Sequence, residues 1–263
     1  MARATSTSIA PIHGNYHGYY LKRPSVRDPR LALLPPSTFA GARVLDVGCN
    51  EGWVTCEIQS WGAHKVVGVD IDDTLIRAAW RKRRTVWSLQ EPGSSLVENS
   101  PHPHPQPDYF PMSCEHESGS LPIPPLETRG RHVFPHNVSF RTANWVATRI
   151  PEDVDGYDVV IAFSISKWIH LNGGDAALVT FFRRVYDVLK PGGMFVLEPQ
   201  AWDTYAKAKR MDERLRENAK KLELRPDDFE NILGTIGFGP AERFGVTGEG
   251  GFRRPVDLYT KLD

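Results

Sequence analysis

The chain has 263 residues, 40% of them hydrophobic, and its 32 basic and 32 acidic residues give a net charge of zero. This length and composition favour one large α/β domain with a substantial core. A zero net charge excludes recruitment of nucleic acid by an overall field, so any polyanion must bind a local patch. Residues 1–10 lack an apolar stretch of signal-peptide length, and no apolar run approaches the roughly 18 residues of a membrane span. We therefore expect an intracellular protein that does not bind membranes.

The first predicted elements alternate between strand and helix. Apolar runs predict strands over 43–47 and 65–70, and helical patterns follow each of them over 51–61 and 72–86. This order predicts right-handed crossovers and a parallel sheet.

The segment 88–136 interrupts this pattern with proline, serine and histidine. Such a composition cannot bury enough apolar surface to offset chain ordering, so we predict a disordered insertion. Its histidines have no regular spacing, which favours a solvated loop over a metal site. The chain's three cysteines show no pairing pattern or C-x-x-C spacing, which predicts a reducing compartment and no structural zinc.

The fold is predicted to resume after the insertion. We expect strands over 137–145 and 157–163, then a helix over 175–189, and a fifth strand that follows a turn within 189–198. Further helices are predicted over 203–222 and 226–236, and an antiparallel pair over 239–246 and 255–261. Ligands of open parallel sheets bind beyond the carboxyl ends of the strands. The residues that follow Val47, Val69, Ala143, Phe163 and Leu197 should therefore face the site.

The sequence R-V-L-D-V-G-C-N-E-G over 43–52 predicts a cofactor-binding turn. Gly48 and Gly52 allow a tight bend and a close backbone approach, and Asn50 tolerates positive φ. Asp70 lies 70 − 48 = 22 residues after the first glycine, a spacing that lets a carboxylate reach ribose hydroxyls. The dinucleotide pattern G-x-G-x-x-G is absent, and Asp46 two residues before the glycine is typical of S-adenosylmethionine sites. An unrelated βαβ protein with a tight glycine turn is the alternative.

The run L-K-P-G-G-M-F-V-L-E over 189–198 resembles the helix end, turn and fifth strand of class I methyltransferases. Together with the turn at 43–52, it makes the chain similar to that superfamily. The resemblance implies an α/β Rossmann-like fold: a mostly parallel sheet, helices on both faces, and an antiparallel C-terminal strand pair.

Motifs at the strand ends point to one family within this superfamily. F-S-I-S-K-W-I-H-L-N over 163–172, L-E-P-Q-A-W over 197–202 and G-F-R-R-P-V over 251–256 accompany G-N-Y-H-G-Y-Y over 14–20 and D-P-R-L over 28–31. They resemble the RNA 5′-methylphosphate capping enzymes, the bicoid-interacting-type S-adenosylmethionine-dependent methyltransferases. The resemblance covers 14–84 and 138–261. It implies O-methylation of the 5′-terminal phosphate of a small noncoding RNA.

The same resemblance implies one methyltransferase domain over 1–263, with an N-terminal extension over 1–40 that contributes to the site. It also implies a monomer located in the nucleus, with the cytoplasm as a second location. This monomer would bind an RNA 5′ end and the protein partners of an RNA particle. Carried over residue by residue, and with Asp46 added from the cofactor turn, the cofactor-binding set is Tyr20, Arg30, Asp46, Gly48, Cys49, Asn50, Asp70, Ile71, Asn144, Trp145 and Phe163. The substrate phosphate would meet Tyr19, Arg23 and Lys167.

The chemistry of these residues agrees with a phosphate acceptor. A phosphate oxygen is already anionic, so its methylation needs no general base. The N-P-P-Y loop of amino-directed methyltransferases is missing after the strand at 157–163, and Lys167 stands there instead. A lysine is a point-charge ligand for phosphate, and Arg23 offers a bidentate fork.

Several residues have a plainer alternative. Lys167 could cap a turn or pair with Asp175, and Arg23 and Arg30 could form surface ion pairs. Packing competes with substrate contact for His170, Trp168 and Trp202. The basic run over 81–84 could be a nuclear address, an RNA backbone contact, or cations at a helix C-terminus.

Two other functions remain open at this stage. One is a noncatalytic subunit that stabilises an RNA–protein particle, and the other is a methyltransferase for proteins or small molecules. The sequence does not distinguish a γ-phosphate from a monophosphate acceptor.

Overall fold

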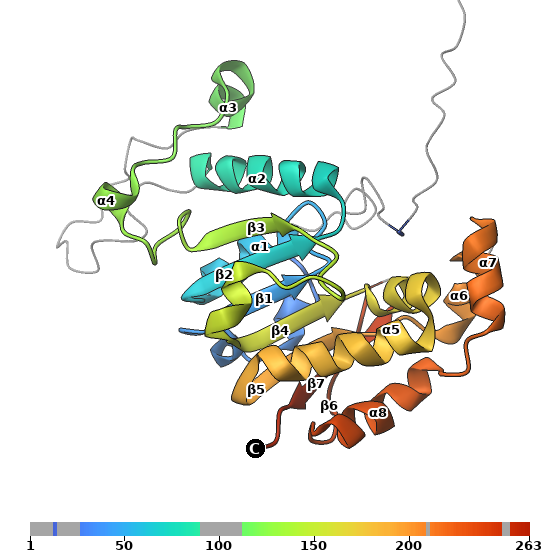
Figure 1. Ribbon diagram of the computed structural model, residues 1–263. Coiled ribbons are helices and arrows are strands. Elements are labelled where there is room, and N and C mark those ends of the chain that lie inside the picture. Colours follow the sequence, from blue (N-terminus) through green and yellow to red (C-terminus); the bar gives the residue numbers. More distant parts are fainter. Residues whose placement is uncertain (1–12, 15–26, 90–111, 209–210, 249–252) are drawn as a thin grey trace, which may run out of the picture.

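A computed structural model describes residues 13–14, 27–89, 112–208, 211–248 and 253–263 (Figure 1). Its centre is a seven-stranded sheet with the order β3-β2-β1-β4-β5-β7-β6. The strands are β1 (Arg43–Val47), β2 (Lys65–Asp70), β3 (Val138–Thr142), β4 (Tyr157–Phe163), β5 (Leu189–Glu198), β6 (Glu242–Thr247) and β7 (Arg254–Thr260). The first five strands pair in parallel, and β7 pairs antiparallel with β5 and β6. The predicted parallel sheet and the antiparallel C-terminal pair are therefore confirmed.

Helices cover both faces of this sheet (Figure 1). The apolar side chains of α1 and α2 join one core cluster with the sheet, and those of α5 and α8 join another on the opposite face. None of the helices in the described residues is both long and apolar enough to span a membrane. The α-helices are α1 (Trp53–Ile58), α2 (Asp73–Ser88), α3 (Met112–Ser118), α4 (Leu126–Arg129), α5 (Ser166–Val188), α6 (Tyr205–Ala208), α7 (Glu213–Lys220) and α8 (Phe229–Ile236).

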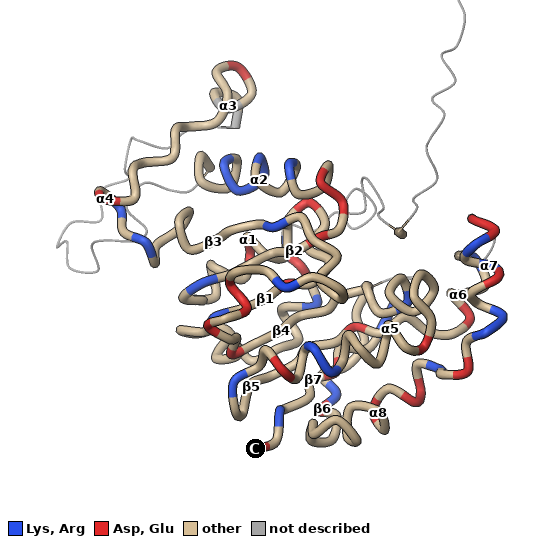
Figure 2. Tube along the Cα trace, in the orientation of Figure 1, with Lys and Arg blue, Asp and Glu red and all other residues tan. Residues whose placement is uncertain are grey.

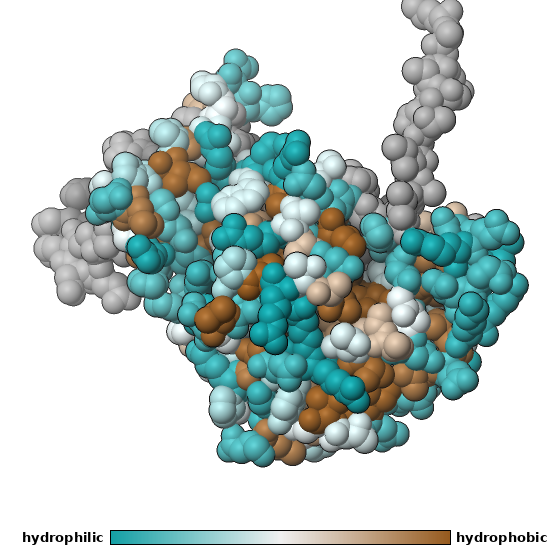
Figure 3. All heavy atoms as spheres, in the orientation of Figure 1, coloured by the Kyte–Doolittle hydropathy of each residue, from teal (hydrophilic) through white to brown (hydrophobic). Residues whose placement is uncertain are grey.

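Two helical regions add to or differ from the sequence prediction. The predicted helix over 175–189 is present in α5 after Gly174, whose φ of 72° and ψ of −175° are not helical, and an additional helical segment that starts at Ser166 precedes it. The predicted helix over 203–222 is divided into α6 and α7, and the Asp212 side chain caps the amino end of α7. In Figure 3 hydrophilic residues cover α7, whereas hydrophobic residues gather around α5 and α8.

Residues 121–136 of the predicted disordered insertion pack against α2 and the adjoining core. The Trp87 indole donates a hydrogen bond to the Pro122 carbonyl at 3.1 Å, and the Leu121 amide donates to Ser88 Oγ at 2.7 Å. Phe134 is buried in the same core cluster as α2. Residues 112–136 thus contain α3, α4 and packed chain, a correction to the disorder predicted for 88–136. Residues 90–111 of the insertion lie outside the described residues.

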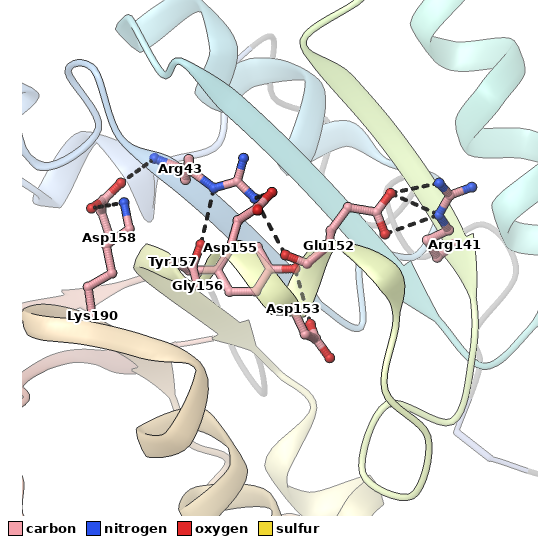
Figure 4. Close-up of polar contacts among 9 residues, drawn as sticks. All are labelled: Arg43, Arg141, Glu152, Asp153, Asp155, Gly156, Tyr157, Asp158 and Lys190. Carbon is pink, nitrogen blue, oxygen red and sulfur yellow. Dashed lines mark hydrogen bonds and ion pairs between the residues drawn. The ribbon is translucent and has the colours of Figure 1, made fainter.

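Polar contacts hold the amino edge of the sheet (Figure 4). The Arg43 amide, at the start of β1, donates to Asp158 Oδ2 at 2.7 Å, and its guanidinium donates to the Gly156 carbonyl at 3.1 Å. Lys190 of β5 pairs with the same Asp158 carboxylate at 2.8 Å. This edge is consequently tied together by ion pairs, and the opposite, carboxyl edge carries the site.

Phe140 of β3 packs over two glycines that flank the cofactor turn. A Cβ atom added at Gly68 would lie 2.7 Å from Phe140 Cδ1 and 3.0 Å from Cys49 Cβ. At Gly52, where φ is +75°, an added Cβ would lie 2.7 Å from Phe140 Cζ. Only glycine therefore allows the turn, β2 and β3 to approach this closely.

The Gly68→Ala substitution should lower the free energy of unfolding by about 1–3 kcal/mol, because the added methyl group overlaps Phe140 in a packed core. Gly234→Ala in α8 is the matched control. A Cβ there meets nothing within 4 Å, and alanine favours helix, so stability should stay equal or rise by up to about 1 kcal/mol. Urea unfolding of both variants measures the difference. Equal stabilities of the two variants would contradict this account of the β2–β3 contact.

Candidate active site

The turn after β1 has the backbone that its sequence predicts. Gly48, Asn50 and Gly52 adopt positive φ values of 77°, 51° and 75°. The Gly48 amide donates to the Val69 carbonyl at 2.8 Å, which fastens the turn to the end of β2. A Cβ atom at Gly48 would lie 2.9 Å from Ile165 Cδ1, so the turn also lies directly against the residue that precedes α5. Helix α1 begins at Trp53, slightly later than predicted.

Asp70 ends β2 beside this turn. Its carboxylate accepts hydrogen bonds from the Asn50 amide at 3.0 Å and from the Asp72 amide at 3.0 Å. Burial raises the pKa of Asp70 above its ordinary value, and these amide hydrogen bonds oppose that effect. The carboxylate is thus held in one orientation at the mouth of the turn.

A cavity of about 330 Å³ opens at the carboxyl ends of β1, β2 and β3. Five of the predicted cofactor residues line it, namely Gly48, Asp70, Ile71, Asn144 and Trp145. The wall that the sequence analysis missed comes from α5 and its neighbourhood, and includes Ile165, Ile169, Asn172 and Arg214. Arg214 of α7 donates to Asn172 Oδ1 at 2.9 Å, which closes this side. Ile165, Ile169 and Asn172 recur at helical spacing within the motif over 163–172, and that spacing was the available signal. Arg214 reaches this wall only because α7 packs against α5.

The N-terminal extension reaches the same cavity. His13 lines it, and Gly14 lies so close to the Trp168 indole that an added Cβ would be 1.9 Å from Trp168 Cδ2. Trp168 itself is buried and also lines the cavity. The predicted residues Tyr19, Tyr20 and Arg23 lie outside the described residues.

Asp46 and Cys49 are buried behind the turn and do not line the described cavity. Asp46 accepts a hydrogen bond from Thr55 Oγ1 at 2.6 Å. Burial raises the pKa of Asp46 to about 6, and burial likewise raises the pKa of the Cys49 thiol. Their side chains support the turn from within the core, and their contact with the cofactor stays a prediction.

Arg30 is a buried residue rather than a surface cation. Its side chain is 1% exposed, and its guanidinium contacts Asp28 Oδ2 at 2.6 Å and Glu198 Oε2 at 2.9 Å. The guanidinium also stacks on the Phe163 ring, 4.4 Å from its centroid. The structure therefore rejects the exposed ion pair considered for Arg30 and joins the N-terminal segment to the ends of β4 and β5.

Ser164, Glu198 and Arg254 form a polar network that was not predicted from the sequence. Ser164, with φ 61°, donates a hydrogen bond from its hydroxyl to Glu198 and accepts one from Arg254 Nη1 at 2.6 Å. Glu198 and Arg254 are buried. Polar side chains directly after two apolar strands were the available signal, since these residues stand in the motifs quoted above.

Lys167 lies in the first turn of α5, next to this network. Its amide donates to Gln200 Oε1 at 3.1 Å, its Nζ donates to Thr204 Oγ1 at 3.4 Å, and the residue is 7% exposed. Burial, and then the positive charge of Arg254, lower the pKa of Lys167 to about 8. Among the described residues no carboxylate forms an ion pair with Lys167. Asp175, the partner considered for it, binds His170 instead.

His170 and Trp202 have the contacts of packing residues. The two ring nitrogens of His170 lie 2.6 Å from Asp175 Oδ1 and 3.2 Å from the Tyr205 hydroxyl. Burial lowers the pKa of His170, which favours the neutral ring. Trp202 packs against Tyr205 and beneath the Arg225 guanidinium. These contacts support the packing interpretation of both residues.

The buried carboxyl of Asp46 predicts a pH effect on stability. Because its folded pKa of about 6 exceeds the ordinary 3.8, folding favours the protonated form. The contribution of Asp46 to the free energy of unfolding is therefore fully present below about pH 4 and is lost as pH rises to about 6. Relative to Asp46→Asn, the wild type should lose up to about 3 kcal/mol of unfolding free energy across that range. Chemical denaturation at successive pH values measures the difference.

Asp158→Asn is the control, because the contribution of Asp158 to stability should change with pH in the opposite direction. The pKa of Asp158 lies below its ordinary value because Lys190 and the Arg43 amide bind the charged form against the opposing effect of burial. Its contribution to stability is present above the ordinary pKa and is lost as pH falls. A difference between wild type and Asp46→Asn that does not change with pH would contradict the assignment for Asp46.

Two family models match the chain. The model of the Bicoid-interacting protein 3 (Bin3) family matches residues 157–261, and a methyltransferase-domain model matches residues 45–108. In solved structures, the chain resembles the magnesium protoporphyrin IX methyltransferase of Synechocystis with bound S-adenosylmethionine. The TM-score is 0.53 at 14% identity, with 89% of this chain and 76% of that chain covered. The fold is thus that of the class I methyltransferases, as predicted.

Curated relatives match nearly the whole chain. It is 39% identical to the 7SK snRNA methylphosphate capping enzyme of Mus musculus, over 95% of this chain and 40% of that protein. It is 34% identical to a probable RNA methyltransferase of Arabidopsis thaliana, and that match covers 94% of this chain and 79% of that protein. It is 31% identical to the U6 snRNA methylphosphate capping enzyme of Drosophila melanogaster, with 95% of this chain and 74% of that protein covered. The chain spans about 40% of the length of the mouse and human relatives. On these matches, this chain belongs to the Bicoid-interacting protein 3 family of methyltransferases.

Proposed function

We propose that this chain is an S-adenosylmethionine-dependent O-methyltransferase that acts on the 5′-terminal phosphate of a small noncoding RNA. The observation that carries the proposal is a buried lysine, Lys167, that forms no ion pair with a carboxylate among the described residues. Its chain neighbours Ile165 and Trp168 line a cofactor-sized cavity at the carboxyl edge of the sheet. The names of the mouse, human and Drosophila relatives support the same acceptor.

The residues of the cavity fit this cofactor. Gly48 lets the backbone approach a ligand, and the oriented carboxylate of Asp70 is an acceptor for ribose hydroxyls. Ile71, Asn144 and Trp145 would hold the rest of the nucleoside from the ends of β2 and β3. When bound, the cofactor supplies a methyl group on a positively charged sulfonium. Tyr20, Arg30, Asp46, Cys49, Asn50 and Phe163 remain predicted members of the site.

The acceptor side needs charge and position rather than a base. A phosphate oxygen is anionic at neutral pH, and His170, the nearest candidate base in sequence, is engaged by Asp175 and Tyr205. Lys167 offers a cation in a buried setting, where a charge-assisted contact to phosphate is strong. Tyr19 and Arg23 would complete the phosphate contacts.

The proposal extends to the setting of the enzyme. We infer a nuclear location and an RNA-particle context from the small nuclear RNAs named for the relatives. The single-domain organisation and the monomeric state stay predictions.

The acceptor can be tested directly with purified protein and labelled S-adenosylmethionine. RNA ending in a 5′-triphosphate or 5′-monophosphate should be labelled, and the same RNA with a 5′-hydroxyl should not. Lys167→Met should lower kcat/KM about 10- to 150-fold, the loss of a charge-assisted contact of roughly 1.5–3 kcal/mol. Lys190→Met is the matched control at the opposite edge of the sheet and should leave the rate unchanged. Equal labelling of phosphate and hydroxyl ends would refute the proposal.

The pKa of Lys167 gives a second test. Its charge is present below a pKa of about 8 and is lost as pH rises through that value. The second ionisation of a terminal phosphate lies near pH 6, so the substrate stays fully charged through this range. Thus kcat/KM for the 5′-phosphate RNA should fall as pH rises above about 8. In Lys167→Arg, whose guanidinium keeps its proton, this decline should disappear from the pH profile. A decline that persists in Lys167→Arg would assign it to another group.

A further inference from the structure

Helix α2 concentrates positive charge in a chain whose net charge is zero. It contains five basic residues and one acidic residue, a net charge of 5 − 1 = +4. Four of the basic residues form the run over 81–84. The last turn of α2 contains no basic residue, so the run lies within the helix and its interpretation as helix-end cations is wrong. Figure 2 shows these basic residues recurring along α2.

Two members of the run have structural contacts. Arg83 Nη1 donates to the Val138 carbonyl at 2.8 Å and the Pro135 carbonyl at 3.2 Å. Lys82 Nζ lies 3.2 Å from the centroid of the Trp53 ring. These contacts bind α2 to its neighbours and explain why two positions in the run are basic.

The other three basic residues, Arg77, Arg81 and Arg84, form what we call the α2 basic face. Their spacing of four and three residues places them on one side of the helix, and all three are exposed. Arg77 pairs with Asp73 at 2.6 Å, and both side chains are more than half exposed. Within the described ranges, the side chains of Arg81 and Arg84 form no ion pair or hydrogen bond.

Like charges at this spacing weaken a helix, because they repel across one turn. A solvated face usually mixes both signs, whereas the α2 basic face carries only Asp73 as a counter-charge. No described packing contact explains Arg81 or Arg84. The arrangement is instead complementary to an extended polyanion, whose repeated charges would relieve the repulsion.

The amino end of α2 lies beside the candidate active site. α2 begins at Asp73, two residues after Ile71, which lines the cavity. Arg77 and Arg84 are seven residues apart, or about 10 Å along the helix axis, a span of several successive phosphates on one nucleic acid strand. Beyond the end of α2, the Arg129 guanidinium stacks on Trp87 at 4.3 Å and Arg131 is exposed, so positive charge continues toward α4.

We propose that the α2 basic face binds the phosphodiester backbone of the RNA body while the 5′ end of that RNA occupies the active site. The inference rests on the proposed function for its choice of RNA as the polyanion. Arginines that meet phosphates carry no base specificity, so this surface would add affinity for RNA length rather than for sequence. It would favour structured RNAs over short 5′ ends as substrates.

The test compares three purified proteins: wild type, the triple variant Arg77→Gln/Arg81→Gln/Arg84→Gln, and a control triple variant Arg183→Gln/Lys190→Gln/Arg243→Gln. The control residues lie on α5, β5 and β6, away from α2. Binding of a long-stemmed RNA hairpin with a 5′-hydroxyl end is measured by fluorescence anisotropy between about 50 and 200 mM KCl. Methyl transfer is measured on a 5′-triphosphate hairpin and on a short 5′-triphosphate oligonucleotide. Thermal unfolding checks that all three proteins are folded.

The α2 variant should bind the hairpin at least about tenfold more weakly at low salt. The logarithm of its association constant should also decrease less steeply with the logarithm of the salt concentration, the slope being smaller in magnitude by about two to three, or about one for each lost phosphate contact. Its kcat/KM on the short oligonucleotide should equal that of wild type. Unchanged hairpin binding, or an equal loss in the control variant, would overturn the inference. So would a requirement for the three arginines in binding anionic lipid vesicles but not RNA.

Because the 5′-hydroxyl hairpin is bound but not methylated, the two proposals fail separately. Absence of methyl transfer from all RNAs, with the binding difference intact, would refute the proposed function and leave the RNA surface in place. Normal methylation with no binding difference would refute the surface alone.

Discussion

The active-site edge of this protein depends on the buried guanidinium of Arg30. A charge this deeply buried is tolerated only when it is fully paired, and Asp28 and Glu198 provide that pairing from opposite sides. The consequence is topological: Asp28 belongs to the segment before the first strand, and Glu198 ends β5. One ion network therefore fastens the N-terminal segment across the carboxyl edge of the sheet, where it covers Phe163.

The same network places positive charge on the acceptor side. Glu198 accepts the Ser164 hydroxyl, which in turn accepts a hydrogen bond from Arg254, and Lys167 follows within the next turn of chain. Arg254 is close enough to Lys167 to help lower the pKa of that lysine. Buried cations next to each other repel, and an anionic ligand removes that repulsion. The repulsion between Lys167 and Arg254 is thus a physical reason why this edge would favour the phosphate acceptor proposed above.

The cofactor side of the site has the opposite character. It is a largely apolar cavity, with one oriented carboxylate, Asp70, and a turn whose glycines expose the backbone. Phe140 of β3 holds this turn in place by packing directly against Gly52 and Gly68. The two sides meet at Ile165, which touches Gly48 and immediately precedes α5. A largely apolar cavity beside a cationic edge, held on one sheet, would suit the proposed transfer of a methyl group to an anion.

The sequence by itself determined the elements whose structure depends on near neighbours. The positive φ values at Gly48 and Asn50, the apolar strands of the parallel sheet, and the position of Lys167 after β4 follow from local conformational preference and strand order. The tertiary structure decided which distant side chains meet. Arg30 and Glu198 are 168 residues apart and Arg254 and Ser164 are 90 apart, so their contacts depend on strand order and packing rather than on any pattern in the chain. Packing also placed a helical segment that starts at Ser166 before the predicted helix at 175, and laid residues 121–136 against α2, because buried partners there outweigh weak local preference.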